Sequence, residues 1–171
     1  MKPTFTIAAV AVAATALLGA LAPGVDATTA SATFSGPAMY GAVQFNSLPS
    51  GSGVSIAINI VAGPQVGKSY AWHIHNKPVP ADGNCVATEG HFDPYNVKAN
   101  SKPEYKCNPA DKLNTCELGD LSGKYGPIKA TCGSTFSTCV VDENINMDML
   151  AGKSVVIHDG DARIVCANIA A

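Results

Sequence analysis

The chain has 171 residues, with 11 Lys and Arg against 13 Asp and Glu, and a formal net charge of −2. This slight acidity argues against nucleic acid as the main partner, because domains that bind nucleic acid usually carry a basic surface. Beyond residue 27, no apolar run approaches the roughly 20 residues that a membrane-spanning helix requires.

The first 27 residues are expected to form a secretory signal peptide. Lys2 provides a positive start, an Ala-rich apolar run follows, and Val25-Asp26-Ala27 ends in the small residue that cleavage prefers. A membrane anchor is the alternative, and the short run followed by a cleavage site fits it less well. Removal of this peptide leaves residues 28–171 as one secreted domain, still at a net charge of −2 because Lys2 and Asp26 leave together.

The last six residues, "CANIAA", contain neither a Ser/Thr-rich stalk nor a hydrophobic tail. We therefore expect no lipid-anchor signal in this chain. The expected location is extracellular, and the sequence leaves open whether the protein is retained at a cell wall.

The predicted elements of the domain are almost all short β-strands. Within residues 53–63, the apolar side chains of Val54, Ile56, Ile58 and Ile60 alternate with other residues, as in a strand with one buried face. Eight strand-like runs separated by turns predict an all-β sandwich or barrel. They are residues 32–36, 39–46, 53–63, 69–75, 127–132, 137–142, 153–158 and 162–169.

Residues 76–127 interrupt this pattern. They hold six prolines, many polar residues and few apolar runs. A loop of this length inside a compact domain usually carries function.

All six cysteines lie in the predicted mature domain. An even number behind a secretory signal predicts three disulfides, although six cysteines allow about fifteen pairings. Thiolate ligation of a metal is the other interpretation, and it is disfavoured because no CxxC pair is present and the compartment is oxidising. The cysteines are Cys85, Cys107, Cys116, Cys132, Cys139 and Cys166.

The four histidines form a candidate metal site. His73 and His75 in "AWHIH" point to the same face of a strand, because side chains alternate along it. His91 begins the long loop in "EGHFDPYN", and His158 ends the apolar run "KSVVIH". Three or four imidazoles without a thiolate or thioether suit copper or zinc. The alternative for "HIH" alone is a pair of polar residues on a solvated strand face.

Several separated motifs then occur in one order along the chain. They are "SGPAMYGAVQF" at 35–45, "HIH" at 73–75, "GHFDP" at 90–94, "GDL" at 119–121, "KSVVIH" at 153–158 and "ARIVC" at 162–166. Together they resemble the copper–zinc superoxide dismutase family from about Ala32 to Ile169. The resemblance implies an eight-stranded Greek-key β-barrel, in agreement with the strand count. It also implies an enzyme that converts superoxide to O2 and hydrogen peroxide by cycling one copper per chain between Cu(II) and Cu(I).

The resemblance also assigns roles to residues. Arg163 matches the arginine that lies beside the copper and attracts the anionic substrate. His91 would leave the copper on reduction and deliver a proton on reoxidation. Cys85 and Cys166 match the disulfide that ties the long loop to the last strand. The four matching copper ligands are His73, His75, His91 and His158.

Proximity alone suggests how the other cysteines pair. Cys107–Cys116 and Cys132–Cys139 are the simplest pairs, because each joins cysteines that are close in the sequence. This pairing is a guess from spacing, and the resemblance does not supply it.

Two departures from the family favour its copper-only subtype, found in fungi and related secreted proteins. The family's zinc site adds two histidines and an aspartate to the shared His91. Asp120 matches the aspartate, but the copper site already uses all four histidines, so we expect no zinc. Glu117 stands where one missing histidine would fall, and we expect it to accept the second N–H of His91 while Asp120 supports the loop.

The second departure is the short connection between His158 and Arg163. Only "DGDA" separates them, so the family's long charged loop is absent and the copper should be more open to solvent. Like the copper-only relatives, the protein is expected to be a monomer.

Other functions remain possible from the sequence alone. A secreted copper carrier or storage protein could use the same four histidines without catalysis, and would not need Arg163. A zinc hydrolase or lyase would leave His158 spare and has no obvious general base. A purely structural β-sandwich leaves the histidines unexplained.

Overall fold

The computed structural model describes residues 28–101, 104–130 and 133–171. The expected signal peptide at 1–27 and Cys132 lie outside the described residues. Within the described ranges, no helix is long and apolar enough to cross a membrane.

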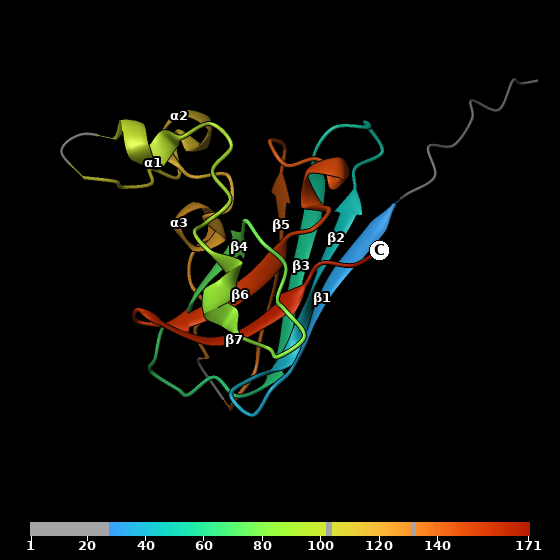
Figure 1. The fold of residues 1–171 in the computed structure, drawn as a ribbon, viewed down its shortest axis with the longest axis vertical. Coiled ribbons are helices and arrows are strands. Elements are labelled where there is room, and N and C mark those ends of the chain that lie inside the picture. Colours follow the sequence, from blue (N-terminus) through green and yellow to red (C-terminus); the bar gives the residue numbers. More distant parts are fainter. Residues whose placement is uncertain (1–27, 102–103, 131–132) are drawn as a thin grey trace, which may run out of the picture.

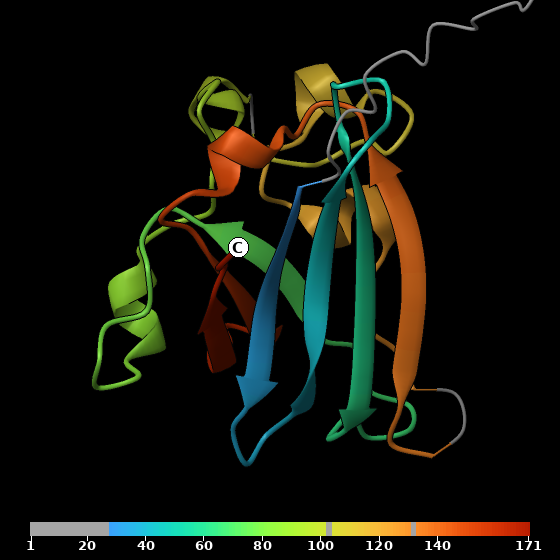
Figure 2. The same cartoon turned by 90° about the vertical axis from the view of Figure 1, so that its right-hand side faces the viewer.

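Two antiparallel sheets form the body of the domain (Figure 1). The larger sheet has the order β1-β2-β3-β5 and the smaller one the order β4-β6-β7. In Figure 2, the four strands of the larger sheet lie side by side. Its strands are β1 (Thr29–Ser35), β2 (Tyr40–Ser47), β3 (Val54–Ala62) and β5 (Phe136–Asp142), and those of the smaller sheet are β4 (Ala71–His75), β6 (Ser154–Asp159) and β7 (Ala162–Asn168).

The chain changes sheet between β3 and β4, between β4 and β5, and between β5 and β6. Because β5 returns to pair with β3, the connections are of the Greek-key kind. The predicted all-β class and two-sheet architecture are confirmed.

The strand count and the barrel closure differ from the prediction. The predicted run at 127–132 is not a strand among its described residues, since only Ile128 pairs, through an isolated bridge to Tyr70. Pro127 has no backbone N–H to donate to a ladder, which limits the pairing of this segment. The two sheets do not close into a barrel: in the described part of the chain, one bridge between Ser31 and Ala170 links the edge of β1 to the segment after β7.

The core lies between the sheets and follows from the strand alternation. The alternating apolar residues of β3 are fully buried, as predicted, and they face the smaller sheet, where Trp72 and Ile74 of β4 are also fully buried. These residues of β3 are Val54, Ile56, Ile58 and Ile60. Burial of one such side chain contributes about 1.5–3 kcal/mol. Since Trp72 and Ile74 point inward, His73 and His75 point to the opposite face of β4.

The long loop after β4 covers that opposite face and the free edge of β4. Backbone or hydroxyl groups of the loop pair with this edge: Ser122 Oγ accepts from Trp72 N, and Gly119 O accepts from Ile74 N. Such cover protects an edge strand from pairing with other chains. The loop carries short helices η1 (Cys85–Thr88), α1 (Val97–Asn100), α2 (Lys112–Thr115) and α3 (Leu121–Tyr125), and η2 (Met147–Leu150) follows β5.

Two disulfides fasten this loop. Cys85–Cys166 ties η1 to β7 across 81 residues, and Cys107–Cys116 closes a short loop before α3. Both join the cysteines that were expected to pair. The expected pair Cys132–Cys139 stays a prediction, because Cys132 lies outside the described residues.

Candidate metal centre

Four histidines converge beside the smaller sheet. One ring nitrogen from each of His73, His75, His91 and His158 lies within 4.8 Å of those of the other three. His73 and His75 come from β4 and His158 from β6, its neighbour in the sheet. His91 comes from the loop and is held by an isolated bridge to His75. The structure therefore brings together all four residues that the sequence singled out.

A three-way backbone junction places His91. Phe92 N donates to Ile74 O at 2.8 Å, Ile74 N donates to Gly119 O at 2.9 Å, and Gly119 N donates to Phe92 O at 2.7 Å. A Cβ atom at Gly119 would lie only 2.4 Å from the carbonyl oxygen of Ile74. Only glycine therefore fits where β4, the His91 segment and the acidic part of the loop meet.

The hydrogen bonds of the rings fit a bound metal ion. Nδ1 of His73 is buried and has no hydrogen-bond partner, which is rare for a buried polar atom. Nδ1 of His75 donates to the carbonyl oxygen of Glu89 at 2.8 Å, which leaves Nε2 as its free lone pair. That Nε2 lies 3.2 Å from Nε2 of His158. Nitrogen lone pairs that turn toward one point are typical of imidazole ligands of copper or zinc.

Burial favours the neutral form of His73, His75 and His158, which is the form that binds metals. Burial lowers the pKa of His75 to about 3 and that of His158 to about 4. The pKa of His73 is lowered as well, again mainly by burial and against the opposing effect of Asp120. These three rings can therefore bind a cation at neutral pH without first losing a proton.

Two buried carboxylates contact the rings from the side away from the cluster. Glu117 pairs with Nδ1 of His91, as expected for a carboxylate that orients a ligating ring. Asp120, which was expected to support the loop, accepts a hydrogen bond within it from Gly123 N at 2.7 Å. The structure adds a contact between Oδ1 of Asp120 and Nε2 of His73 at 3.4 Å.

Asp120 is held as a carboxylate. Burial, the largest influence, would raise its pKa, but hydrogen bonds from His73, Tyr105 and the N–H of Gly123 lower the pKa to about 2. The charge therefore persists throughout the physiological range.

Arg163 is fixed beside the cluster by three acceptors on η1. Its Nη1 donates to the carbonyl oxygens of Cys85 at 2.9 Å and Val86 at 3.2 Å, and to the hydroxyl of Thr88 at 3.0 Å. Its charge contributes to the lowered pKa of both His75 and His158. A permanent cation thus lies near the rings of His75 and His158.

Comparison with known proteins now places the chain. The family description "Copper/zinc superoxide dismutase (SODC)" matches residues 39–168. The chain belongs to the copper/zinc superoxide dismutase family. It is 35% identical over 135 residues to "Cell surface Cu-only superoxide dismutase 5" of Candida albicans, a match that spans 75% of this chain and 54% of that protein.

A second relative comes from another fungus. "Cell surface Cu-only superoxide dismutase" of Arthroderma benhamiae is 37% identical over 106 residues, which cover 57% of this chain and 27% of that protein. The chain thus spans about half or less of the length of these curated relatives. The solved structure of Candida albicans Superoxide Dismutase 5 with Cu(II) superposes with a TM-score of 0.67 at 31% identity, covering 84% of this chain and 91% of that chain.

The described part of this superoxide dismutase family member contains one candidate metal centre. The four histidines are the one group there of three or more His, Cys, Asp or Glu with a metal-ligand arrangement. Since the chain has four histidines in all, none is left for a second, histidine-rich site.

Sequence reasoning missed several residues that shape the centre. The backbone carbonyl of Glu89 accepts from His75, and the hydroxyl of Thr88 accepts from Arg163. A backbone carbonyl is present in every residue type, so the sequence gives no signal for the first of these contacts. Tyr105 stands in "PEYKC" and belongs to no motif, although its hydroxyl contacts the carboxylate of Asp120 and the backbone N–H of Glu117. Gly119 could have been suspected, because it belongs to the "GDL" motif.

Proposed function

We propose that this protein is an extracellular, copper-only superoxide dismutase that converts superoxide to O2 and hydrogen peroxide. The observation that carries the proposal is the four-histidine cluster, with the buried unpaired Nδ1 of His73 and the cation of Arg163 beside it. The fungal relatives that are named Cu-only dismutases of the cell surface support both the metal and the location.

One copper per chain follows from the ligand count. His73, His75, His91 and His158 would all bind the same ion, and the carboxylate of Glu117 would occupy the second nitrogen of His91, where a zinc ion would otherwise be needed. Copper suits a site of imidazoles alone. We therefore propose no zinc in the working enzyme.

The chain's own residues would do the rest of the chemistry. Copper supplies the one-electron exchange through which one superoxide leaves as O2 and a second, with two protons, leaves as hydrogen peroxide. Arg163 attracts the anion to the centre and holds it there. His91 would hold and deliver a proton at Nε2, and Glu117 fixes the opposite nitrogen, Nδ1, so that the ring returns to the same orientation.

Metal content and activity, measured on one sample, test the proposal. The protein is loaded with copper and zinc together, analysed by mass spectrometry and assayed for superoxide consumption. One copper, no zinc and fast consumption are expected. One copper without consumption would favour the carrier function, and stoichiometric zinc would contradict the ligand count.

The proposal extends to processing and assembly. A signal peptide at 1–27 would be removed to leave residues 28–171, and the mature protein would be a monomer. Mass spectrometry of the secreted protein should give a start at Thr28, and sedimentation should give the mass of one chain. An intact N-terminus or a dimer would contradict these parts of the proposal alone.

A further inference from the structure

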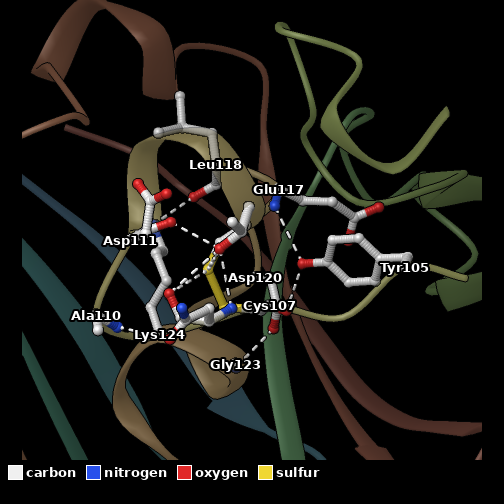
Figure 3. Close-up of a disulfide and its surroundings, with 12 residues drawn as sticks. Tyr105, Cys107, Ala110, Asp111, Glu117, Leu118, Asp120, Gly123 and Lys124 are labelled. Atoms are coloured by element: carbon white, nitrogen blue, oxygen red, sulfur yellow. Dashed lines mark hydrogen bonds between the residues drawn. A yellow bond between two sulfur atoms is a disulfide. The ribbon is translucent and has the colours of Figure 1, made fainter. Parts of the chain in front are cut away.

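One phenol connects the two acids that face the histidine cluster. The hydroxyl of Tyr105 accepts a hydrogen bond from the backbone N–H of Glu117 at 3.0 Å and donates one to Oδ2 of Asp120 at 2.7 Å. Figure 3 shows this hydroxyl between the two residues. Both bonds join parts of the loop that no helix or strand ladder connects, so Tyr105 supplies a tertiary contact there.

The direction of these bonds is well defined. A phenol has one proton to donate, and Asp120 is the acceptor within reach, so the hydroxyl must accept from the N–H of Glu117. Burial and the hydrogen bond to Asp120 raise the pKa of Tyr105 well above its usual range. The group therefore stays a donor.

The bond from Tyr105 decides how Asp120 faces His73. With Oδ2 engaged by the phenol, Oδ1 receives the N–H of Gly123 at 2.7 Å and lies 3.4 Å from Nε2 of His73. A Cβ atom at Gly123 would lie 2.2 Å from Oδ2, so the backbone closes tightly around this carboxylate. An acceptor at Nε2 favours the tautomer of His73 whose lone pair is at Nδ1, the buried atom without a partner.

A disulfide keeps Tyr105 close to the acids. Cys107 follows Tyr105 by two residues and Cys116 precedes Glu117 by one, and their Cα atoms are 4.4 Å apart. The two segments that the phenol bridges are therefore also joined covalently (Figure 3).

We infer that Tyr105 is a positioning residue for the metal centre: its hydroxyl fixes Glu117 and Asp120, and through them the orientation of two of the four histidine rings. The inference rests on the proposed copper site, though not on dismutase activity. In this loop the phenol and the Cys107–Cys116 disulfide together give the rigidity that a second bound metal ion would give.

The substitution Tyr105→Phe tests this, because it removes one hydroxyl and little else. Tyr125→Phe is the matched control: Tyr125 is also half-buried in the loop, and its hydroxyl donates to the carbonyl oxygen of Val141 at 3.0 Å, away from the acids. The first readout is 15N–1H NMR of the imidazoles in the metal-free protein, and the second is the rate at which copper passes to a chelator.

In Tyr105→Phe, the His73 ring signals should shift or split between tautomers, and copper release should be about tenfold faster. Tyr125→Phe should match the parent protein in both readouts. Parental His73 signals and parental copper release in Tyr105→Phe would overturn the inference.

A double-mutant cycle with Asp120→Asn separates this role from general packing. If Tyr105 sets the His73 ring through Asp120, the His73 ring signals of the double variant should match those of Asp120→Asn alone. A further shift of these signals in the double variant would overturn the inference.

The role of Tyr105 can also be tested if the variant does not fold or if the parent protein is inactive. If Tyr105→Phe fails to fold, the parent protein should still show a slowly exchanging hydroxyl proton with a nuclear Overhauser effect to the Glu117 N–H, and its absence would overturn the inference. If the parent binds copper without consuming superoxide, the proposed function fails, whereas the NMR and copper-release tests of Tyr105 are unaffected.

Discussion

The histidine rings of the cluster differ in the group that contacts the ring nitrogen pointing away from the metal position. His75 donates to a backbone carbonyl, that of Glu89, whereas His91 and His73 contact carboxylates. Glu89 has a φ of 60°, a conformation that non-glycine residues adopt at a cost of order 1–3 kcal/mol. In that conformation its carbonyl accepts the hydrogen bond from His75, so a strained residue contributes to the orientation of this ring.

At this scale, the first prediction concerns Glu117. Glu117→Gln keeps the shape but removes the charge that faces His91, so the ring becomes a weaker ligand. Copper affinity and turnover should each fall by about 10–100-fold. Competition with a chelator and superoxide consumption measure the two effects.

Glu143→Gln serves as the control, because it removes an exposed carboxylate that no described hydrogen bond or ion pair uses. It should leave copper affinity at the parental value. Equal copper affinity in Glu117→Gln and the parent would refute the role of Glu117.

The second prediction concerns the cation. Arg163→Ala removes the charge beside the cluster, so turnover should fall by about tenfold and should depend less on ionic strength. Superoxide consumption at low and high salt measures both. Lys129→Ala, which removes an exposed cation, should leave the rate nearly unchanged. A steep salt dependence that persists in Arg163→Ala would contradict the prediction.

Among the elements, the junction at Gly119 connects β4, the His91 segment and the acidic part of the loop. Gly119→Ala must push a Cβ atom against backbone atoms of Ile74 and Phe92, which cannot yield as a side chain can. The variant should lose about 2–4 kcal/mol of stability, and its Tm should fall by about 10 °C. Thermal unfolding of the metal-free protein measures this.

Gly90→Ala is the matched control in the same loop. A Cβ atom at Gly90 would meet no other atom within 4 Å. Its Tm should stay within about 2 °C of the parent. If Gly90→Ala and Gly119→Ala unfold at the same temperature, the close approach at Gly119 is not what holds the junction together.

The elements also show which features a sequence can predict. Seven of the eight predicted runs are strands, because alternation of apolar residues reports directly on burial. The run at 127–132 has apolar and β-branched residues but begins with Pro127, and pairing among its described residues is limited to one bridge, between Ile128 and Tyr70. Local composition could not reveal that limit.

The same reasoning applies to the centre. Histidines are few and chemically distinctive, so their spacing and a family resemblance were enough to group them. The position of Tyr105 and the contact of His73 with the carboxylate of Asp120 depend on the path of a long loop, which no periodicity encodes. Contacts made by common residues across irregular backbone are therefore the part that only a structure provides.

For the whole molecule, the buried histidines predict how stability depends on pH. The pKa is about 3 for His75 and about 4 for His158, against 6.5 in the unfolded chain. The unfolded chain therefore binds more protons than the folded one below pH 6.5, and stability must fall as the pH is lowered from there toward 4. Asp120, with a pKa of about 2 against 3.8, extends the loss to lower pH.

The metal-free protein should accordingly unfold at a lower temperature at pH 4.5 than at pH 7.5. His158→Gln removes one titrating ring, so the difference between the two pH values should be smaller in this variant. Calorimetry at both pH values measures the effect. A midpoint that does not change with pH in the parent would contradict the burial of these rings.

The Cys85–Cys166 disulfide also affects the stage of maturation at which Arg163 is fixed beside the metal centre. It anchors η1 to β7, and η1 carries the three oxygen atoms that hold Arg163. Closing a loop of 81 residues stabilises the fold by about 4 kcal/mol. A newly made chain in a reducing compartment lacks this bridge. For the proposed secreted protein, oxidation of Cys85 and Cys166 would thus be the final assembly step, the one that anchors η1 and with it the guanidinium of Arg163.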